Sequence, residues 1–194
     1  MSVKTWTVQM VDVYLESTFN DKPTYAANEK VNFTYTPYGA IPKTVHFKLD
    51  GVELESVETT ASGLLQSYTL SAQTHGAHLL EVWMTATVNN VEIETPHIYK
   101  DIIWYDAESD VPVIGCIYRY DHYGIVAARQ YNTTEITYVV YDPSAENPTI
   151  TRYVDGESIG TQTLDGASDI WSYKSSEVGE KILVIECGIT SVEI

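Results

Sequence analysis

Apolar and polar residues alternate over short stretches of this chain, a pattern that predicts β-strands with one buried face. In residues 43–49 every second side chain from position 45 is apolar, and the Asp50-Gly51 pair that follows favours a two-residue turn. Such a turn places Leu49 opposite Val52, where the apolar alternation resumes. Register and hydrophobic pattern therefore agree on a hairpin.

The same rule predicts a second hairpin. The even-numbered residues from Leu80 to Val88 are apolar, Asn89-Asn90 tolerates positive φ, and Val91 and Ile93 continue the same face. Further strands are expected at residues 6–15, 31–35, 64–70, 113–120, 135–141, 149–154, 158–164, 170–173 and 181–187.

These elements occur twice along the chain, about a hundred residues apart. The matching segments are residues 43–51 and 148–156, residues 76–82 and 179–185, and residues 91–93 and 192–194. A unit of this length with its own turns and strands is a domain. Short strands separated by turns, without a sustained helical period, predict an all-β fold of two tandem immunoglobulin-like antiparallel β-sandwiches, residues 1–105 and 111–194.

The segment between the two copies is short and acidic. It covers residues 104–112 and ends in Pro112. Because so short a linker leaves little room for bending, we expect the two sandwiches to lie nearly end to end.

The two copies are unequal. Arg152 occupies the position of Phe47, which predicts a smaller or looser second core. After Val91-Glu-Ile93 the first copy continues through Ile103, whereas the second stops at Ile194. We expect either a piece of a longer protein, which we favour, or an unusually short last strand.

Composition narrows the classes of partner. The 15 Tyr outnumber the 3 Phe, and Asp and Glu outnumber Lys and Arg by 27 to 11, giving a net charge of -16. Such a surface repels phosphate groups and anionic lipids, so neither nucleic acid nor a membrane is expected as a partner. No apolar run reaches the roughly 18 residues that span a bilayer.

Signatures of catalysis are absent from the sequence. There is no Gly-x-Ser-x-Gly elbow, no phosphate-binding glycine loop, no His-Glu-x-x-His and no Cys-x-x-Cys, so we expect neither an enzyme nor a cofactor. Alignment of the copies places Cys187 where the first has Met84. We interpret Cys187 as a small core residue rather than as half of a disulfide with Cys116.

Two groups of residues have the composition of metal ligands. Asp106, Glu108 and Asp110 offer carboxylates that could hold Ca²⁺ in the linker, but a calcium site needs six or more oxygens. The alternative is a solvated acidic linker. His75 and His78 have a zinc-like spacing, yet no further Cys or His is near in sequence, so ordinary histidines are the preferred interpretation.

Aromatic residues gather around the predicted domain junction. The candidate ligand-binding residues are Trp104, Tyr118, Tyr120 and Tyr123, because sugars stack on exposed flat rings. The alternative is that these rings pack the junction or a sheet face, which is common for amphipathic aromatic residues.

The whole chain resembles tandem immunoglobulin-like domains of bacteriophage and prophage structural proteins, particularly from phages of gut bacteria. The segments that carry the resemblance are residues 31–37, 43–51, 75–84 and 98–106. The resemblance implies a non-enzymatic module in a virion tail, fibre or head decoration, assembled in the bacterial cytoplasm. Its implied partners are other virion chains or adjacent domains.

Three functions remain open on the sequence. The first is a structural spacer of a phage particle. The second is a carbohydrate-binding or host-surface adhesion module, which would place the protein on a virion or a bacterial cell surface and make glycans its partners. The third is an accessory domain of an enzyme, which would require a catalytic domain encoded beside it.

Overall fold

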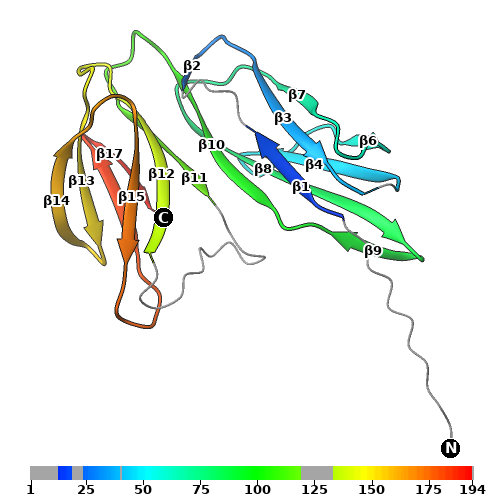
Figure 1. The fold of residues 1–194 in the computed structure, drawn as a ribbon. Helices are drawn as coiled ribbons and strands as arrows, with labels where there is room; N and C mark the ends of the chain where they lie inside the picture. Colours follow the sequence, from blue (N-terminus) through cyan, green and yellow to red (C-terminus); the bar gives the residue numbers. More distant parts are fainter. Residues whose placement is uncertain (1–12, 19–23, 40, 119–132, 194) are drawn as a thin grey trace, which may run out of the picture.

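The computed structural model describes residues 13–18, 24–39, 41–118 and 133–193, and these contain seventeen β-strands and no helix (Figure 1). The all-β prediction is therefore confirmed. The part of the chain that the structure describes has no helix of the length and apolarity needed to cross a membrane.

The first unit is built from strands β1 to β10, arranged in two layers. One sheet has the order β1-β3-β7, and in the other β10, β8 and β4 are neighbours. Four short strands complete the second sheet: β5 and β6 pair with β4, β9 pairs with β8, and β2 runs parallel to β10. The bounds are β1 Leu15–Thr18, β2 Thr24–Ala26, β3 Val31–Pro37, β4 Lys43–Leu49, β5 Val52–Glu53, β6 Val57–Thr59, β7 Gln66–Leu70, β8 Gly76–Val88, β9 Val91–Glu94 and β10 Ile98–Tyr105.

The second unit is built from strands β11 to β17. Its two layers have the orders β15-β12-β11 and β14-β13-β16-β17. The bounds are β11 Val113–Tyr118, β12 Thr133–Tyr141, β13 Thr149–Val154, β14 Glu157–Thr163, β15 Ser168–Lys174, β16 Leu183–Cys187 and β17 Thr190–Glu193.

Both units distribute their main strands in the same way. The first, second and fifth strands form one sheet, and the third, fourth, sixth and seventh form the other, if the short β2 is left out and if β5 and β6 count as one strand and β9 and β10 as another. This antiparallel Greek-key order is that of an immunoglobulin-like sandwich. The prediction of two tandem immunoglobulin-like sandwiches is confirmed.

The two predicted hairpins of the first unit are present with the predicted register. Leu49 pairs with Val52, and Val88 pairs with Val91. Asp50 has φ 51° and Gly51 φ 77°, so both turn residues adopt the left-handed conformation that a two-residue hairpin requires. The side chains of Val52 and Val91 are exposed, although both continue the apolar phase of their hairpins.

Each unit has its own hydrophobic core. The first is formed by Tyr25, Val31, Phe33, Tyr35, Val45, Phe47, Leu49, Leu70, Leu80, Val82, Met84, Ile102 and Trp104. The second is formed by Ile114, Cys116, Ile136, Tyr138, Val140, Ile150, Leu164, Trp171, Leu183, Ile185 and Cys187. Both cysteines are buried and free, which confirms that Cys187 is a core residue and not half of a disulfide.

The side chain of Arg152 lies beside the aromatic residues of the second core. Its guanidinium donates to the Asp169 carboxylate at 2.5 Å and to the Tyr138 hydroxyl at 2.9 Å, and it lies 5.6 Å from the ring centre of Trp171. An ion pair therefore takes the place that Phe47 fills in the first core.

The two units lie side by side, so the expectation of an end-to-end arrangement is wrong. The linker reverses the chain, and β11 runs back antiparallel along β10 (Figure 1). A single ten-stranded sheet therefore passes through both units. Seven of its strands follow one another in the order β15-β12-β11-β10-β8-β4-β5, and β2, β6 and β9 pair with strands of this path. The turn was missed because only tertiary pairing determines the direction of the chain after the linker.

Candidate functional site

The joint between the units, formed by β10, β11, the linker and His75, is the first candidate site. Tyr99 and Lys100 of β10 pair with Tyr118 and Ile117 of β11. Beyond this ladder, the Asp101 carboxylate accepts the backbone N–H of Cys116 at 2.8 Å. A side chain thus continues the pairing after the backbone ladder ends.

Glycine at position 115 permits this close approach. A Cβ atom on Gly115 would lie 3.0 Å from the Cβ of Asp101 and 3.0 Å from the Cγ1 of Ile103. These distances are shorter than ordinary contacts, so any other residue would require the side chains of Asp101 and Ile103, or β11 itself, to shift.

Strand β10 contributes to both cores. Ile102 and Trp104 belong to the first core, whereas Tyr99 packs against the second. Successive side chains of a strand point to opposite faces of the sheet, so one face of β10 serves each unit. Leu79 of β8 also packs against the second core, which extends the contact beyond one strand.

His75 connects the two ends of the linker. The backbone N–H of Asp106 donates to its Nδ1 at 2.9 Å, and its Nε2 lies 2.9 Å from the carbonyl oxygen of Val111. Because a carbonyl oxygen can only accept, Nε2 carries the proton and Nδ1 is the acceptor. The ring is therefore the neutral Nε2–H tautomer.

Aromatic and polar contacts surround His75. Tyr105 of β10 stacks on Tyr141 of β12 with ring centres 4.6 Å apart, and Tyr141 meets the His75 ring edge-on at 6.4 Å. Burial, followed by the nearby Tyr105, Asp106 and Asp142, raises the pKa of the Tyr141 hydroxyl. The Thr190 hydroxyl donates to the carbonyl oxygen of Pro112 at 2.7 Å, which ties the linker to the end of the second unit.

The predicted aromatic ligand residues are not brought together as one described surface. Trp104 is fully buried and donates from Nε1 to the carbonyl oxygen of Glu29 at 2.8 Å, so its ring offers no face to a ligand. Tyr118 ends β11, opposite Tyr99. Tyr120 and Tyr123 lie outside the described residues.

The predicted acidic metal ligands do not converge either. Asp106, Glu108 and Asp110 are exposed, and one Asp106 carboxylate oxygen accepts the backbone N–H of Glu108 at 3.0 Å, forming a local turn. Across the described ranges, no group of three or more His, Cys, Asp or Glu side chains could hold a metal ion.

The two histidines with zinc-like spacing have separate roles. Whereas His75 serves the joint, His78 contacts the Asp50 carboxylate through Nδ1 at 2.6 Å and the carbonyl oxygen of Thr74 through Nε2 at 3.1 Å. Both partners of His78 are acceptor oxygens of the first unit. The pair does not form a zinc site.

A second cluster lies on the outer face of the first unit and was not predicted. Four rings form a row across the sheet: His46 and Trp83 are 5.0 Å apart, Trp83 and His97 4.7 Å, and His97 and Tyr99 6.1 Å. Both faces of Trp83 are occupied by histidine rings, so the indole is 8% exposed and has no free face for a sugar.

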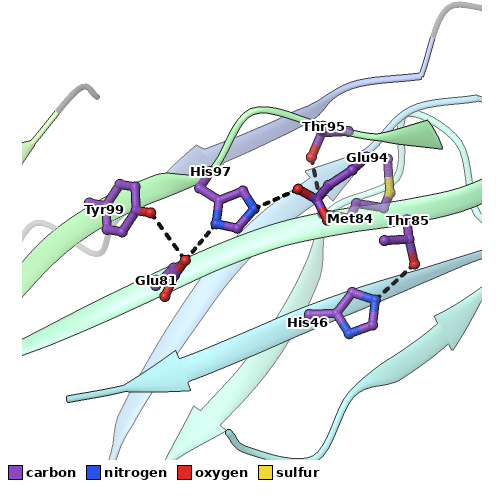
Figure 2. A network of polar contacts seen from close by, with 8 residues as sticks. All are labelled: His46, Glu81, Met84, Thr85, Glu94, Thr95, His97 and Tyr99. Atoms are coloured by element: carbon purple, nitrogen blue, oxygen red, sulfur yellow. Dashed lines mark hydrogen bonds and ion pairs between the residues drawn. The ribbon is translucent and has the colours of Figure 1, made fainter. Parts of the chain in front are cut away.

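Two carboxylates, those of Glu81 and Glu94, contact the His97 and Tyr99 end of this ring row, as Figure 2 shows. His97 contacts Glu81 through Nδ1 at 2.5 Å and Glu94 through Nε2 at 3.1 Å, and the Tyr99 hydroxyl donates to Glu81 at 3.1 Å. Burial, with the charge of Glu81, raises the pKa of Tyr99 to about 12. The sequence signal was the outward phase of β4 and β8, in which His46 and Trp83 are direct neighbours.

The described thiols do not form a nucleophilic site. Burial raises the pKa of Cys187 to about 11, with a further contribution from Asp142, so the thiol is protonated at neutral pH. Cys116 is also buried. The side chains of the joint contact one another, and so do the side chains of the ring row, and in both clusters these contacts are structural.

Comparison with known proteins gives structural likeness alone. No protein-family model and no curated protein matches this chain. It is similar to the fibronectin(III)-like modules of Clostridium thermocellum CbhA, at 16% identity and a TM-score of 0.36 over 93% of this chain and 91% of that one. A chimeric titin Z1Z2 tandem is similar at 13% identity and a TM-score of 0.35 over 95% of both chains.

A larger protein is similar over part of its length. Parabacteroides merdae β-glucuronidase matches 97% of this chain at 10% identity and a TM-score of 0.38, and the match covers 24% of the enzyme. The fold assignment rests on the strand order described above, and none of these similarities carries a function to this chain.

Proposed function

We propose that this chain is a non-enzymatic structural spacer that holds two neighbouring parts of an assembly at a fixed distance and angle. The observation that carries the proposal is the β10–β11 pairing, which makes one sheet continuous through both units. A flexible tether needs no such pairing, because a linker alone would connect two independent domains.

Several contacts favour a fixed angle at the joint. Backbone pairing, the Asp101 to Cys116 hydrogen bond and the His75 contacts restrain translation along β10. Packing of Leu79 and Tyr99 against the second core opposes rotation of the units about the sheet. These contacts bury both apolar and polar groups, so separating the units would expose both.

We place this spacer in a bacteriophage particle, as a tail, fibre or head-decoration component that is assembled in the bacterial cytoplasm. The support is the resemblance of its strand and turn segments to phage immunoglobulin-like domains, together with a net charge of -16 that disfavours nucleic-acid and membrane partners. The partners are other virion chains or adjacent domains, and the bacterial cell surface is the alternative location.

The test is whether the units reorient together in solution. Residual dipolar couplings measured by NMR should fit one alignment tensor for both units. Gly115→Val should loosen the joint, because the added side chain meets Asp101 and Ile103, whereas Ser172→Val on the exposed edge of β15 should not. Two independent tensors in the unmodified chain would contradict the spacer.

A glycan array tests the adhesion alternative on the same protein. The spacer predicts no specific glycan binding. Binding that is lost in Tyr120→Ala and Tyr123→Ala, with folding intact, would replace the spacer by an adhesion module.

A further inference from the structure

We propose that the joint contains a pH-sensitive contact in which neutral His75 holds the linker against both units and protonation of its ring releases the linker. This inference rests on the proposed spacer function, because it concerns the angle that the joint maintains. It adds a condition under which the angle changes.

The hydrogen bonds of His75 require the neutral ring. A backbone N–H can only donate, so Nδ1 must present its lone pair to Asp106, and a carbonyl oxygen can only accept, so Nε2 must donate to Val111. The two partners lie at opposite ends of the linker turn. One imidazole therefore closes the turn at both ends.

Protonation places a hydrogen on Nδ1 opposite the N–H of Asp106. Two donors then face each other across 2.9 Å, and the contact is lost. The Val111 contact can persist, so the change begins at the β10 end of the linker. Imidazoles titrate in the range of about pH 5 to 8, where few other side chains change charge.

The groups around His75 do not compensate for this loss. The Asp106 carboxylate is turned toward the backbone of Glu108, and the His75 ring makes a T-shaped contact with Tyr141, which stacks on Tyr105. Glu108 and Asp110 of the linker are exposed, and Asp142 follows Tyr141 at the end of β12. The ring nitrogens of His75 contact the Asp106 backbone N–H and the Val111 carbonyl oxygen, and none of these carboxylates.

His75 differs in this respect from the other histidines that the structure describes. Both ring nitrogens of His78 and of His97 face acceptor oxygens, so protonation satisfies their contacts. His46 contacts a hydroxyl group, which can donate or accept. His75 alone in the described ranges accepts from a backbone N–H, so acidification should act at the joint.

The experiment compares the full chain at about pH 7.5 and about pH 5 by NMR. In the unmodified chain, protection of the Asp106 amide from hydrogen exchange, corrected for the intrinsic effect of pH, should fall about tenfold between the higher and the lower pH. Residual dipolar couplings should show one tensor at the higher pH and a changed or averaged angle at the lower pH.

His75→Gln keeps a side-chain acceptor and a donor but cannot titrate. This variant should hold one angle at both pH values, and the control His46→Gln, on the outer sheet face, should respond like the unmodified chain. Unchanged Asp106 protection while the His75 ring protonates would overturn the proposal. If His75→Gln fails to fold, the tautomer of the His75 ring in the unmodified chain at about pH 7.5 tests the proposal instead. The proposal requires the Nε2–H tautomer, so the Nδ1–H tautomer would contradict it.

The outcomes separate this inference from the spacer function. Units that reorient independently at both pH values contradict the spacer. Units that keep one angle at both pH values leave the spacer standing and contradict the pH-sensitive contact.

Discussion

The carboxylate of Asp50, in the turn between β4 and β5, accepts the backbone N–H of Leu79 at 2.8 Å. The backbone N–H of Asp50 donates in return to the carbonyl oxygen of Leu79 at 2.9 Å. The second unit repeats this arrangement: Asp155 accepts from Ile182 at 3.0 Å and donates to its carbonyl oxygen at 2.8 Å.

A basic residue accompanies the turn aspartate in both units. His78 contacts Asp50, and Lys181 donates to Asp155 at 2.9 Å. The Asp-Gly turn therefore does more than reverse the chain, since its carboxylate fixes the start of a strand in the same sheet. This second role gives a physical reason why both copies carry Asp-Gly at this place.

Replacing Asp155 should lower stability in a pH-dependent way. The N–H of Ile182, and then the Lys181 ammonium, lower the pKa of Asp155. A lowered folded-state pKa means that the contact stabilises at pH above the ordinary value, about 4, and that the stabilisation is lost as the pH falls through the folded value. In urea denaturation at neutral pH, Asp155→Ala should unfold at lower denaturant than the unmodified chain.

The matched control for this prediction is Asp165→Ala, in the exposed turn between β14 and β15. It should leave the unfolding midpoint unchanged. An Asp155→Ala deficit that stays equally large well below about pH 4 would show that the carboxylate charge is not the cause.

Local structure was predictable where a turn and an alternating pattern agree. The hairpins at Asp50-Gly51 and Asn89-Asn90 have the predicted register because positive φ at the turn and the apolar phase select the same pairing. Residues 149–154 also form a strand with the predicted limits, although Arg152 interrupts its apolar phase.

The joint and the ring row were not predictable in this way. Pairing of β10 with β11 depends on Gly115, whose importance follows from what lies opposite it and not from its own sequence context. The ring row through His46 and Trp83 depends on the register between β4 and β8, two strands that are far apart in sequence. Trp104 was assigned to a possible surface because a strand pattern does not tell which sheet face meets a core.

Breaking the ion pair of the second core should cost more than replacing it by an apolar side chain. Asp169→Ala leaves the Arg152 guanidinium and the Tyr138 hydroxyl without their shared acceptor. We expect the free energy of unfolding to fall by about 2 kcal/mol. This is less than the loss for a fully buried pair, because the side chains of Arg152 and Asp169 are partly exposed. Arg152→Met should cost less than about 1 kcal/mol.

Urea denaturation of both variants and of the double variant measures this difference. The double variant should resemble Arg152→Met, because Asp169 loses its main partner there. If Arg152→Met lost more stability than Asp169→Ala, position 152 would not tolerate an apolar residue. The expectation that it does comes from the first unit, where the apolar Phe47 occupies the matching position.

Both cysteines should resist thiol reagents in the folded protein. Cys116 and Cys187 are buried, and the pKa of Cys187 is raised to about 11, so little thiolate is available at neutral pH. We expect a chromogenic disulfide reagent to label neither thiol under native conditions and to label two thiols per chain in denaturant. Rapid native labelling would show that the second core opens, and one equivalent or none in denaturant would contradict two free thiols.

The ring row should appear in the alkaline titration of the tyrosines. Burial first, and then the charge of Glu81, raises the pKa of Tyr99 to about 12. The neutral phenol is therefore favoured in the folded state, so its stabilising effect is complete below the ordinary pKa of about 10 and is lost as the pH rises from there toward the folded value.

The difference in phenolate absorbance between the unmodified chain and Tyr99→Phe isolates the titration of this hydroxyl. In Glu81→Gln its pKa should fall but stay above the ordinary value, because burial is the larger cause, and Glu92→Gln on exposed β9 should leave it unchanged. If Tyr99 titrated near the ordinary value in the unmodified chain, its hydroxyl would not be desolvated beside Glu81 as described.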